Sequence, residues 1–377
     1  MKATWDAIWA VAVKDWLCFS RQPFLIAVSV VMPLVFLLLY AIIVPASNTN
    51  PVVVALDDSG PAGQRFLAVM REIGTREGPF YEIVTTDPAT ARRQFASGQA
   101  LGMVVIPAGF GTQLAESDAT VELHLHNINS DYSKNLRLRL DLAVRQFSDQ
   151  LTAPSVLVDE VPRLSQDPKM QDYISTSLLL FAVLYSAMMG TGLHVTGEWN
   201  DRTIKELLLA PQGRGTIVLG KMLAGMGQSL PSVGLVLALL YWIFGFYPTG
   251  SLWSMAGLMA VVMVLGAGLG ALFGVAGKST LVVTSLMITT SFLIFFLSGN
   301  EDSVRGLAWG GPLVGLWYLA RLLPTTYGFL VARTLLLTGD AATLSRDLIL
   351  LILTTAAIVA LAAASLRRAY SQLPGGQ

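Results

Sequence analysis

The sequence predicts an α-helical polytopic membrane protein with six transmembrane helices, additional re-entrant or interfacial helices, and an inserted extracytoplasmic α/β domain. Of the 377 residues, 53% are hydrophobic and only 13% are charged, whereas soluble domains carry about 25% charged residues. The apolar residues occur in blocks of about 20, the length that crosses a bilayer as a helix. Residues 45–172 break this pattern, because their charge content is ordinary and their hydrophobic periodicity is short.

Residues 1–22 precede the first apolar block and predict an amphipathic helix that lies in the membrane interface. Asp6, Lys14 and Asp15 lie off its apolar stripe. Because tryptophan rings favour the interface, we expect the stripe to face lipid, with packing against soluble protein as the alternative. The stripe recurs at intervals of three and four residues and consists of Trp5, Ile8, Trp9, Ala12, Val13, Trp16 and Leu17.

Residues 23–44 form the first expected transmembrane helix. A cleaved signal peptide is the alternative, since small residues follow Val44 and Pro45. The apolar run is too long for a signal sequence, and so is the amphipathic segment before it. We therefore expect the helix to be retained in the protein.

Residues 45–172 predict a compact α/β domain in which strands and helices alternate. His124 and His126 share one strand face without a third ligand, so we expect no metal site. The only cysteine, Cys18, excludes an intramolecular disulfide. Apolar runs indicate strands at 52–56, 80–85, 101–106 and 120–126. Helical periodicity and an N-terminal proline indicate helices at 61–74, 88–97, 109–117 and 131–151.

Residues 173–377 contain the other five expected transmembrane helices. Their apolar blocks lie at 173–196, 217–246, 252–276, 279–297 and 348–366. Residues 301–340 are also apolar, but they are interrupted by Gly310, Gly311, Pro312 and Pro324. This broken pattern predicts short re-entrant or interfacial helices rather than another complete span.

The distribution of Lys and Arg predicts the orientation of the chain. Loops on the opposite side from the α/β domain contain Lys2, Lys14, Arg21, Arg202, Lys205, Arg214, Lys221, Lys278, Arg367 and Arg368. The other loops contain fewer cations, and acidic residues accompany them. By the positive-inside rule, both termini and residues 198–221 are expected in the cytoplasm, and residues 45–172 outside it.

The turn after residue 276 carries Gly277-Lys278-Ser279-Thr280, which looks like part of a phosphate-binding loop. That loop requires a glycine five positions before Gly277, where this chain has Leu272. We therefore expect no ATPase site in this chain, and neither catalytic residues nor a bound cofactor.

Gly266, Gly270 and Gly274 repeat at four-residue spacing along one predicted span. Such glycines let helix backbones approach closely, and we expect packing within the chain, with a subunit interface as the alternative. His194 lies near the cytoplasmic end of its span. With Lys221 counted among the loop residues, no Asp, Glu or Lys is expected inside the spans to relay protons with His194, which disfavours an ion-coupled transporter.

The loop at 198–221, EWNDRTIKELLLAPQGRGTIVLGK, is charged and amphipathic although long apolar blocks flank it. Leu207, Leu208 and Leu209 offer an apolar surface that fits a groove on a soluble partner, and the charged neighbours offer ion pairs. An ordinary loop helix resting on the membrane is the alternative.

This loop resembles the intracellular loop of ABC-2 type permeases, which reads like E-x-x-x-G-T-x-x-x-L-L-x-x-P and is followed by L-G-K. The matching residues are Glu198, Thr203, Glu206, Leu207, Leu208, Leu209, Pro211 and Leu219-Gly220-Lys221, with Arg202 in place of the usual glycine. GMVVIPAGF at 102–110 is similar to an element of the multidrug-efflux-like subgroup, which has a large extracytoplasmic domain after the first transmembrane helix. FLSG at 296–299 and Leu323-Pro324 follow in the order typical of the family.

The resemblance implies the permease subunit of an ATP-binding cassette exporter, with residues 1–22 as its elbow helix. Two permease chains, as a homodimer or a paralogue heterodimer, would pair with two cytoplasmic ATPase subunits that bind ATP and Mg. It also implies a bacterial inner membrane and a periplasmic adaptor. Binding of nucleic acid is not expected, because the net charge is zero and no basic residues form a concentrated patch. Residues 198–212 would include the coupling helix, with ATPase contacts at Glu198, Arg202, Thr203, Glu206, Leu207, Leu208, Leu209 and Pro211.

A membrane-anchored extracytoplasmic sensor or assembly scaffold is the alternative function. It would explain why residues 45–172 show no recognisable catalytic constellation. Six spans with re-entrant helices exceed what an anchor needs, so the sequence favours a transporter.

Overall fold

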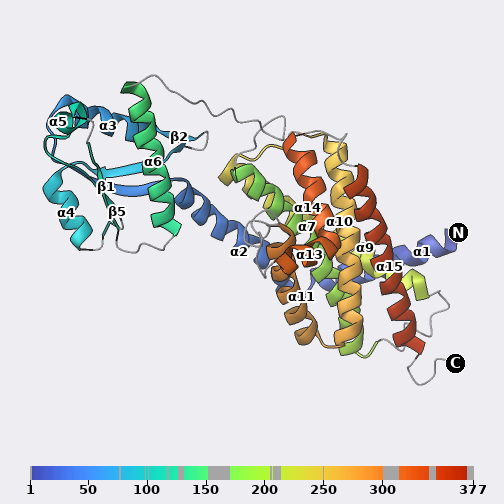
Figure 1. Ribbon diagram of the computed structural model, residues 1–377. Helices are drawn as coiled ribbons and strands as arrows, with labels where there is room; N and C mark the ends of the chain where they lie inside the picture. Colours follow the sequence, from blue (N-terminus) through green and yellow to red (C-terminus); the bar gives the residue numbers. More distant parts are fainter. Residues whose placement is uncertain are drawn as a thin grey trace. The chain divides into compact units, whose positions relative to one another are not determined.

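The computed structural model of the chain contains two compact units (Figure 1). The helical unit comprises Met1–Ala41 and Leu164–Gln377, and the sheet unit comprises Ile42–Arg163. The structure describes residues 2–75, 78–97, 99–100, 102–116, 119–125, 131–151, 170–203, 206, 214–248, 250–299, 314–338 and 345–371.

A four-stranded sheet with the order β4-β1-β5-β6 organises the sheet unit. Its strands are β1 Asn50–Leu56, β4 Tyr81–Thr85, β5 Gly102–Ile106 and β6 Glu122–Leu125. β1 is parallel to both of its neighbours, whereas β6 runs antiparallel to β5. Parallel strands need crossover connections, and α3 (Pro61–Glu72) and α4 (Pro88–Ala96) supply them.

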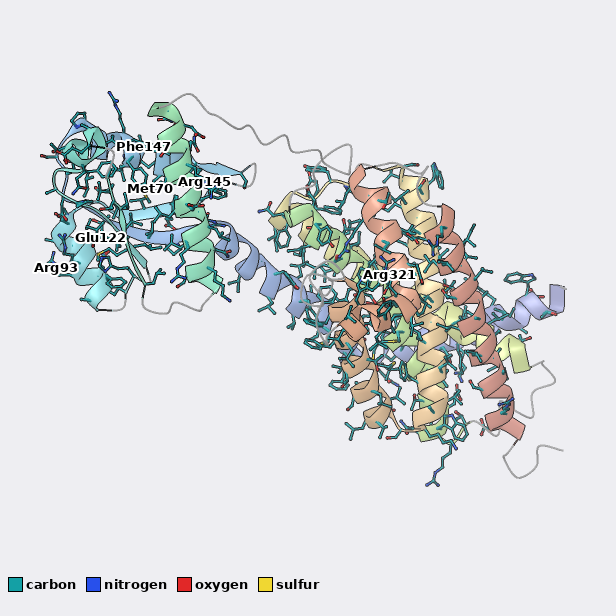
Figure 2. All side chains as sticks on the ribbon, in the orientation of Figure 1. Met70, Arg93, Glu122, Arg145, Phe147 and Arg321 are labelled. Carbon is teal, nitrogen blue, oxygen red and sulfur yellow. The ribbon has the colours of Figure 1, made fainter. Side chains whose placement is uncertain are left out.

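Both faces of β1 are covered, because its side chains alternate between two apolar layers. Val52 points to a core shared with α3, α5 (Phe110–Ala115) and α6 (Asp131–Leu151), and Figure 2 shows Met70 within that core. Val53 points to a smaller core against α4. The strands and helices predicted between residues 52 and 151 are present, with ends that differ by a few residues. A short hairpin of β2 (Gly74–Thr75) and β3 (Gly78–Pro79) is an addition that periodicity did not indicate.

Gly109 and the histidines at 124 and 126 were singled out in the sequence of the sheet unit. Gly109 adopts a φ of 78° between β5 and α5, a left-handed conformation that glycine accommodates readily. His124 Nε2 lies 2.9 Å from Glu122 Oε2, whereas His126 lies outside the described residues. No group of three possible metal ligands occurs among the residues that the structure describes.

The helical unit is built mainly from long helices. The long helices are α1 Lys2–Ser20, α2 Pro23–Asn48 (of which residues 42–48 belong to the sheet unit), α7 Met170–Asn200, α9 Arg214–Phe244, α10 Leu252–Gly277, α11 Thr280–Ile294 and α15 Ser345–Ser371. The short helices are α13 Val314–Leu322 and α14 Pro324–Arg333. The π-helical turns η1 (Phe295–Gly299) and η2 (Thr334–Thr338) extend α11 and α14. Short helices α13 and α14 agree with the broken pattern of residues 301–340, of which 301–313 and 339–340 lie outside the described residues.

Five helices in the described part of the chain are long and apolar enough to cross a membrane. The stretches are Gln171–Asn200, Gly215–Phe244, Leu252–Gly277, Thr280–Gly299 and Arg346–Ser365. The first predicted span falls on α2, whose apolar stretch Ile26–Ile42 is shorter than these five. Length and composition therefore support the five later predicted spans, and the first one, at residues 23–44, stays a prediction.

The central helix of the helical unit is α7, which contacts α9, α10, α11 and α14. Its apolar stretch is completely buried, whereas only 17% of the corresponding stretch of α15 is buried. Gly266, Gly270 and Gly274 of α10 all face α7. A Cβ atom on these glycines would collide with the backbone of α7 at Leu184, Met188 and Gly192. The glycine spacing therefore serves close packing between two helices of this chain.

Candidate functional site: an ion cluster at the end of α7

A buried lysine joins three helices at the C-terminal end of α7. Lys221 lies in the second turn of α9, and only 1% of its side chain is exposed. Its Nζ donates hydrogen bonds to Asp15 Oδ2 of α1 at 3.0 Å and to Glu198 Oε1 of α7 at 2.8 Å. It also donates to the backbone oxygen of His194 at 3.0 Å. One ammonium group thus uses three acceptors, which is its full donor capacity.

Glu198 in turn receives hydrogen bonds from three residues. Its Oε1 accepts from Lys221 and from Lys14 Nζ, the latter at 2.7 Å, and its Oε2 accepts from the hydroxyl of Thr203. Lys14, Asp15, Glu198 and Lys221 are called the ion cluster below. Thr203 connects this cluster directly to the start of the predicted coupling segment.

The formal charges of the ion cluster balance, with two cations and two carboxylates. This balance matters because Asp15, Glu198 and Lys221 are all at least 95% buried, and an unpaired buried charge is strongly unfavourable. Partial burial alone would lower the pKa of Lys14, but the hydrogen bond and charge of Glu198, together with Asp15, raise it above the ordinary value. Lys14 is therefore protonated at neutral pH and completes the balance.

A glycine beside Lys221 allows α1 to reach the cluster. A Cβ atom at Gly220 would collide with Val11 and with the backbone oxygen of Ile8, so α1 lies directly against α9 at this point. The L-G-K run of the sequence therefore has a physical reason. Its glycine admits a neighbouring helix, and its lysine neutralises the carboxylates that this contact buries.

The contact between α1 and α9 corrects the prediction for the N-terminal helix. Ile8 and Ala12 belong to the apolar stripe expected to face lipid, but both are buried. Trp5 and Trp9 remain exposed, with 64% and 68% of their surfaces accessible. The stripe is thus divided between a face on the protein, which also holds Asp15, and an exposed aromatic face.

Arg202 lies two residues after α7 ends at Asn200. Arg202 adopts a φ of 59°, a left-handed conformation that is common for glycine just after a helix and unfavourable for arginine. The resembling permeases carry glycine at this position. A new turn begins at once, because the backbone N–H of Glu206 donates to the oxygen of Thr203 at 3.0 Å.

The boundary of the predicted coupling segment changes accordingly. Residues 198–200 were expected in it but complete α7, because the helix continues until the left-handed residue ends it. Glu198 is buried in the ion cluster, whereas Arg202 and Glu206 are exposed. The remaining predicted contact residues lie outside the described residues, namely Leu207, Leu208, Leu209 and Pro211.

The end of α7 also contacts the turn between α10 and α11. Asn200 Nδ2 donates a hydrogen bond to the hydroxyl of Thr280, and Lys278 Nζ lies 5.1 Å from the centre of the Trp199 ring. Lys278 ends α10 in a left-handed conformation with a φ of 51°. The residues that resemble a phosphate-binding loop thus form a tight turn that contacts α7.

The expectation that no Asp, Glu or Lys lies inside the spans stays a prediction, because the stretches are defined by length and composition alone and Glu198 and Lys221 lie close to their ends. Both belong to stretches long and apolar enough to cross a membrane, and Lys221 binds the backbone oxygen of His194. Two local sequence features pointed to the ion cluster. They were the four-residue spacing of His194 and Glu198 on one helix and the presence of Lys221 in a mainly apolar helix. Neither signal identified the partners, because Asp15 and Lys221 are 206 residues apart.

These long apolar helices, with a charged cluster where α7 ends, define a multi-pass membrane protein. The family model described as ABC-2 family transporter protein matches residues 23–364, which is nearly the whole chain. The chain therefore belongs to the ABC-2 family, whose members are membrane components of ABC transporters. The family assignment made from the loop residues is confirmed, while the subgroup with a large extracytoplasmic domain stays a prediction. No curated protein matches the chain significantly.

Proposed function

We propose that this chain is the membrane-spanning permease subunit of an ATP-binding cassette exporter. It moves substrate out of the cytoplasm with ATP hydrolysed by separate ATPase subunits, which hold the ATP and Mg. Family membership supports this function. The observation that carries the coupling proposal is the hydrogen bond from Thr203 to Glu198, because it joins the loop segment to a cluster shared by three helices.

Residues 203–211 form the ATPase-coupling segment in this proposal. Leu207, Leu208 and Leu209 fill a groove of the ATPase, and Arg202 and Glu206 supply ion pairs at its rim. Movement of the ATPase displaces Thr203 and, through Glu198, the ends of α1, α7 and α9. Helices that share one buried ion cluster are expected to move together, because separating them would leave buried charges without their partners.

The end of α7 that carries the ion cluster faces the cytoplasm in this proposal. Lys221, Lys278 and Arg368 lie near helix ends and Lys14 lies within α1, all on the side that the positive-inside rule assigns to the cytoplasm. Both termini are then cytoplasmic, and residues 45–172 are extracytoplasmic, in a bacterial inner membrane. A second permease chain, identical or paralogous, completes the pathway, and a periplasmic adaptor binds the extracytoplasmic domain.

Co-purification with candidate ABC ATPase subunits from the same organism tests the proposal. We expect Leu207→Asp and Leu208→Asp to abolish ATPase binding, because each inserts a charge into the apolar contact. The matched control is Leu138→Asp on α6, where 65% of the leucine is exposed in the sheet unit; this variant should retain the ATPase. Binding that survives replacement of residues 203–211 by a Gly-Ser linker would exclude this segment as the coupling site.

A further inference from the structure

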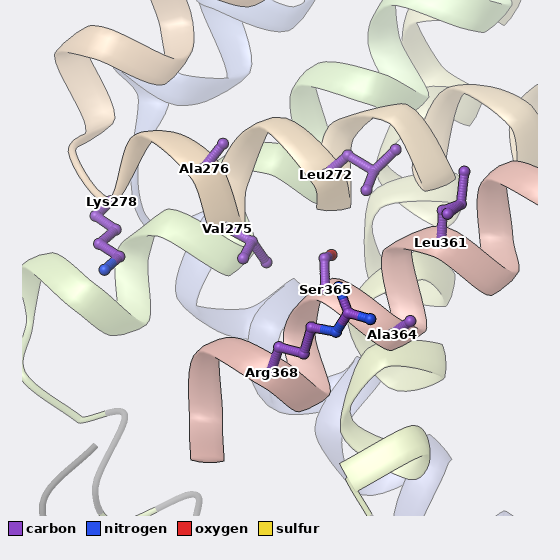
Figure 3. A pocket seen from close by; sticks show the side chains of 8 residues that line it. All are labelled: Leu272, Val275, Ala276, Lys278, Leu361, Ala364, Ser365 and Arg368. Atoms are coloured by element: carbon purple, nitrogen blue, oxygen red, sulfur yellow. The ribbon is translucent and has the colours of Figure 1, made fainter. Parts of the chain in front are cut away.

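A groove lies between the C-terminal parts of α10 and α15 (Figure 3). Its volume is about 550 Å³, which is within the range of ordinary ligand pockets. Leu272, Val275, Leu361 and Ala364 provide apolar walls, and Lys278 and Arg368 belong to the same lining. The groove thus combines a hydrophobic surface with two cations.

The apolar walls and the cations lie at different depths along their helices. The walls belong to the stretches Leu252–Gly277 and Arg346–Ser365, which are apolar enough to lie in a bilayer. Lys278 directly follows the first stretch, and Arg368 lies about one turn beyond the second. Residues just beyond the ends of an apolar span lie at the level of the lipid headgroups.

The charge of the groove matches a particular class of lipid. Among the residues that the structure describes, its lining contains two cations and no carboxylate. Basic sites between transmembrane helices attract anionic headgroups, whereas a zwitterionic headgroup brings a positive charge toward the same cations. An acyl chain suits the apolar walls, which a free phosphate ion would leave unoccupied.

We propose that this groove binds an anionic phospholipid of the leaflet in which α10 and α15 end. One acyl chain lies against Leu272 and Leu361, and the phosphate binds Lys278 and Arg368. This inference goes beyond transport, because it concerns a lipid held at the side of the helical unit rather than the exported substrate.

The position of Lys278 connects this lipid site to the ion cluster. Lys278 lies over Trp199, the residue that follows Glu198 on α7. A phosphate bound to Lys278 therefore acts on the turn that contacts the end of α7. Anionic lipid is expected to fix this turn and to stabilise the contact.

Photolabelling of the full chain tests the lipid site. The probe is phosphatidylglycerol with a photoactivatable acyl chain in phosphatidylcholine vesicles, and the adducts are located by peptide mass spectrometry. We expect adducts on residues 272–278 and 361–368 that labelled phosphatidylcholine does not give. Lys278→Gln and Arg368→Gln should each lower labelling about fivefold, from the attraction of one cation near an anionic membrane surface. Excess inorganic phosphate should not displace the lipid.

Matched variants separate lipid binding from altered folding. Arg21→Gln removes an exposed cation from the turn between α1 and α2 and should leave labelling unchanged. Lys278→Arg keeps the charge and should retain it. Equal labelling by phosphatidylcholine, or unchanged labelling in the Lys278→Gln/Arg368→Gln double variant, would overturn the proposal. Loss of the ATPase from that double variant with unchanged labelling would instead assign the two cations to a protein contact.

Discussion

The two ends of α7 bury a cation in different ways. At one end, Lys221 is surrounded by the carboxylates of Asp15 and Glu198. Near the other end, Arg333 of α14 donates hydrogen bonds to the Ser177 hydroxyl and the backbone oxygen of Gly299. The guanidinium also lies 3.8 Å from the centre of the Tyr173 ring. Ser177 and Glu198 are 21 residues apart, which corresponds to about 32 Å along a helix.

The difference shows that Lys221 and Arg333 stabilise the structure through different kinds of interaction. The ion cluster joins elements from distant parts of the chain through formal charges, so the loss of one charge affects every partner. The contacts of Arg333 include a hydroxyl, a backbone oxygen and an aromatic ring, which suit its flat guanidinium. We therefore expect the cluster to respond strongly to changes of charge and the Arg333 site to respond to changes of shape.

The largest effect is expected for Lys221→Met. The substitution leaves Asp15 and Glu198 buried without their main counter-charge, and breaking a buried pair in this way costs about 3–5 kcal/mol. The measurement is the free energy of unfolding of the detergent-solubilised chain. Lys14→Met is the control, because Lys14 is half exposed and its loss should cost less. Equal losses in the two variants would contradict the central role of Lys221.

A methyl group in the seam between α7 and α10 should have the next largest effect. Gly270→Ala directs a Cβ into the backbone of Met188, and overpacking of this kind costs about 1–3 kcal/mol. Gly257→Ala on the same helix is the control, since nothing lies within 4 Å of the added atom. Alanine there should be neutral or stabilising by up to about 1 kcal/mol. Thermal unfolding of both variants compares them, and similar midpoints would exclude a tight seam.

Replacement of Arg333 tests the second end of α7. Arg333→Met leaves the Gly299 oxygen and the Ser177 hydroxyl without this donor, at a cost of about 1–3 kcal/mol. Arg333→Lys keeps the charge but loses the flat surface against Tyr173, so it should restore only part of the loss. Full restoration by lysine in an unfolding measurement would show that charge dominates here too, and the contrast between the two ends would disappear.

The smallest effect is expected at Arg202, two residues after the end of α7. Arg202→Gly should stabilise the chain by about 1 kcal/mol, because glycine adopts a positive φ without the steric cost of a side chain. Arg202→Ala keeps a Cβ atom and should give no such gain. Unfolding free energies of the two variants provide the measurement. A gain with alanine as large as that with glycine would attribute the effect to loss of the arginine side chain rather than to the backbone.

Local periodicity predicted the elements of both units well. Alternation identified β1, and apolar length identified spans such as α10. Both signals depend on residues that are close in sequence. The partners of Lys221 were not predictable in this way, since Glu198 and Asp15 come from other helices.

The sequence also indicated features whose structural cause only the structure reveals. The apolar stripe of α1 was predicted, but the sequence did not show which part of it is buried. Gly220 lets α1 pack closely against α9, so that Ile8 is buried while Trp9 is exposed. Arg202 was recognised as a departure from the usual glycine, but only the backbone shows that a left-handed residue is required there. The apolar contact residues of the predicted coupling segment lie outside the described residues, so their role stays a prediction.

The glycine seam has a consequence for motion. Where Gly266, Gly270 and Gly274 touch the backbone of α7, the glycines contribute no side chains that could change rotamer and absorb a displacement. Shear between packed helices relies on such small adjustments, so α7 and α10 are expected to move as one rigid body. Rearrangement during a transport cycle then falls to less enclosed helices such as α15 and α11, where only 17% and 28% of the apolar stretch is buried.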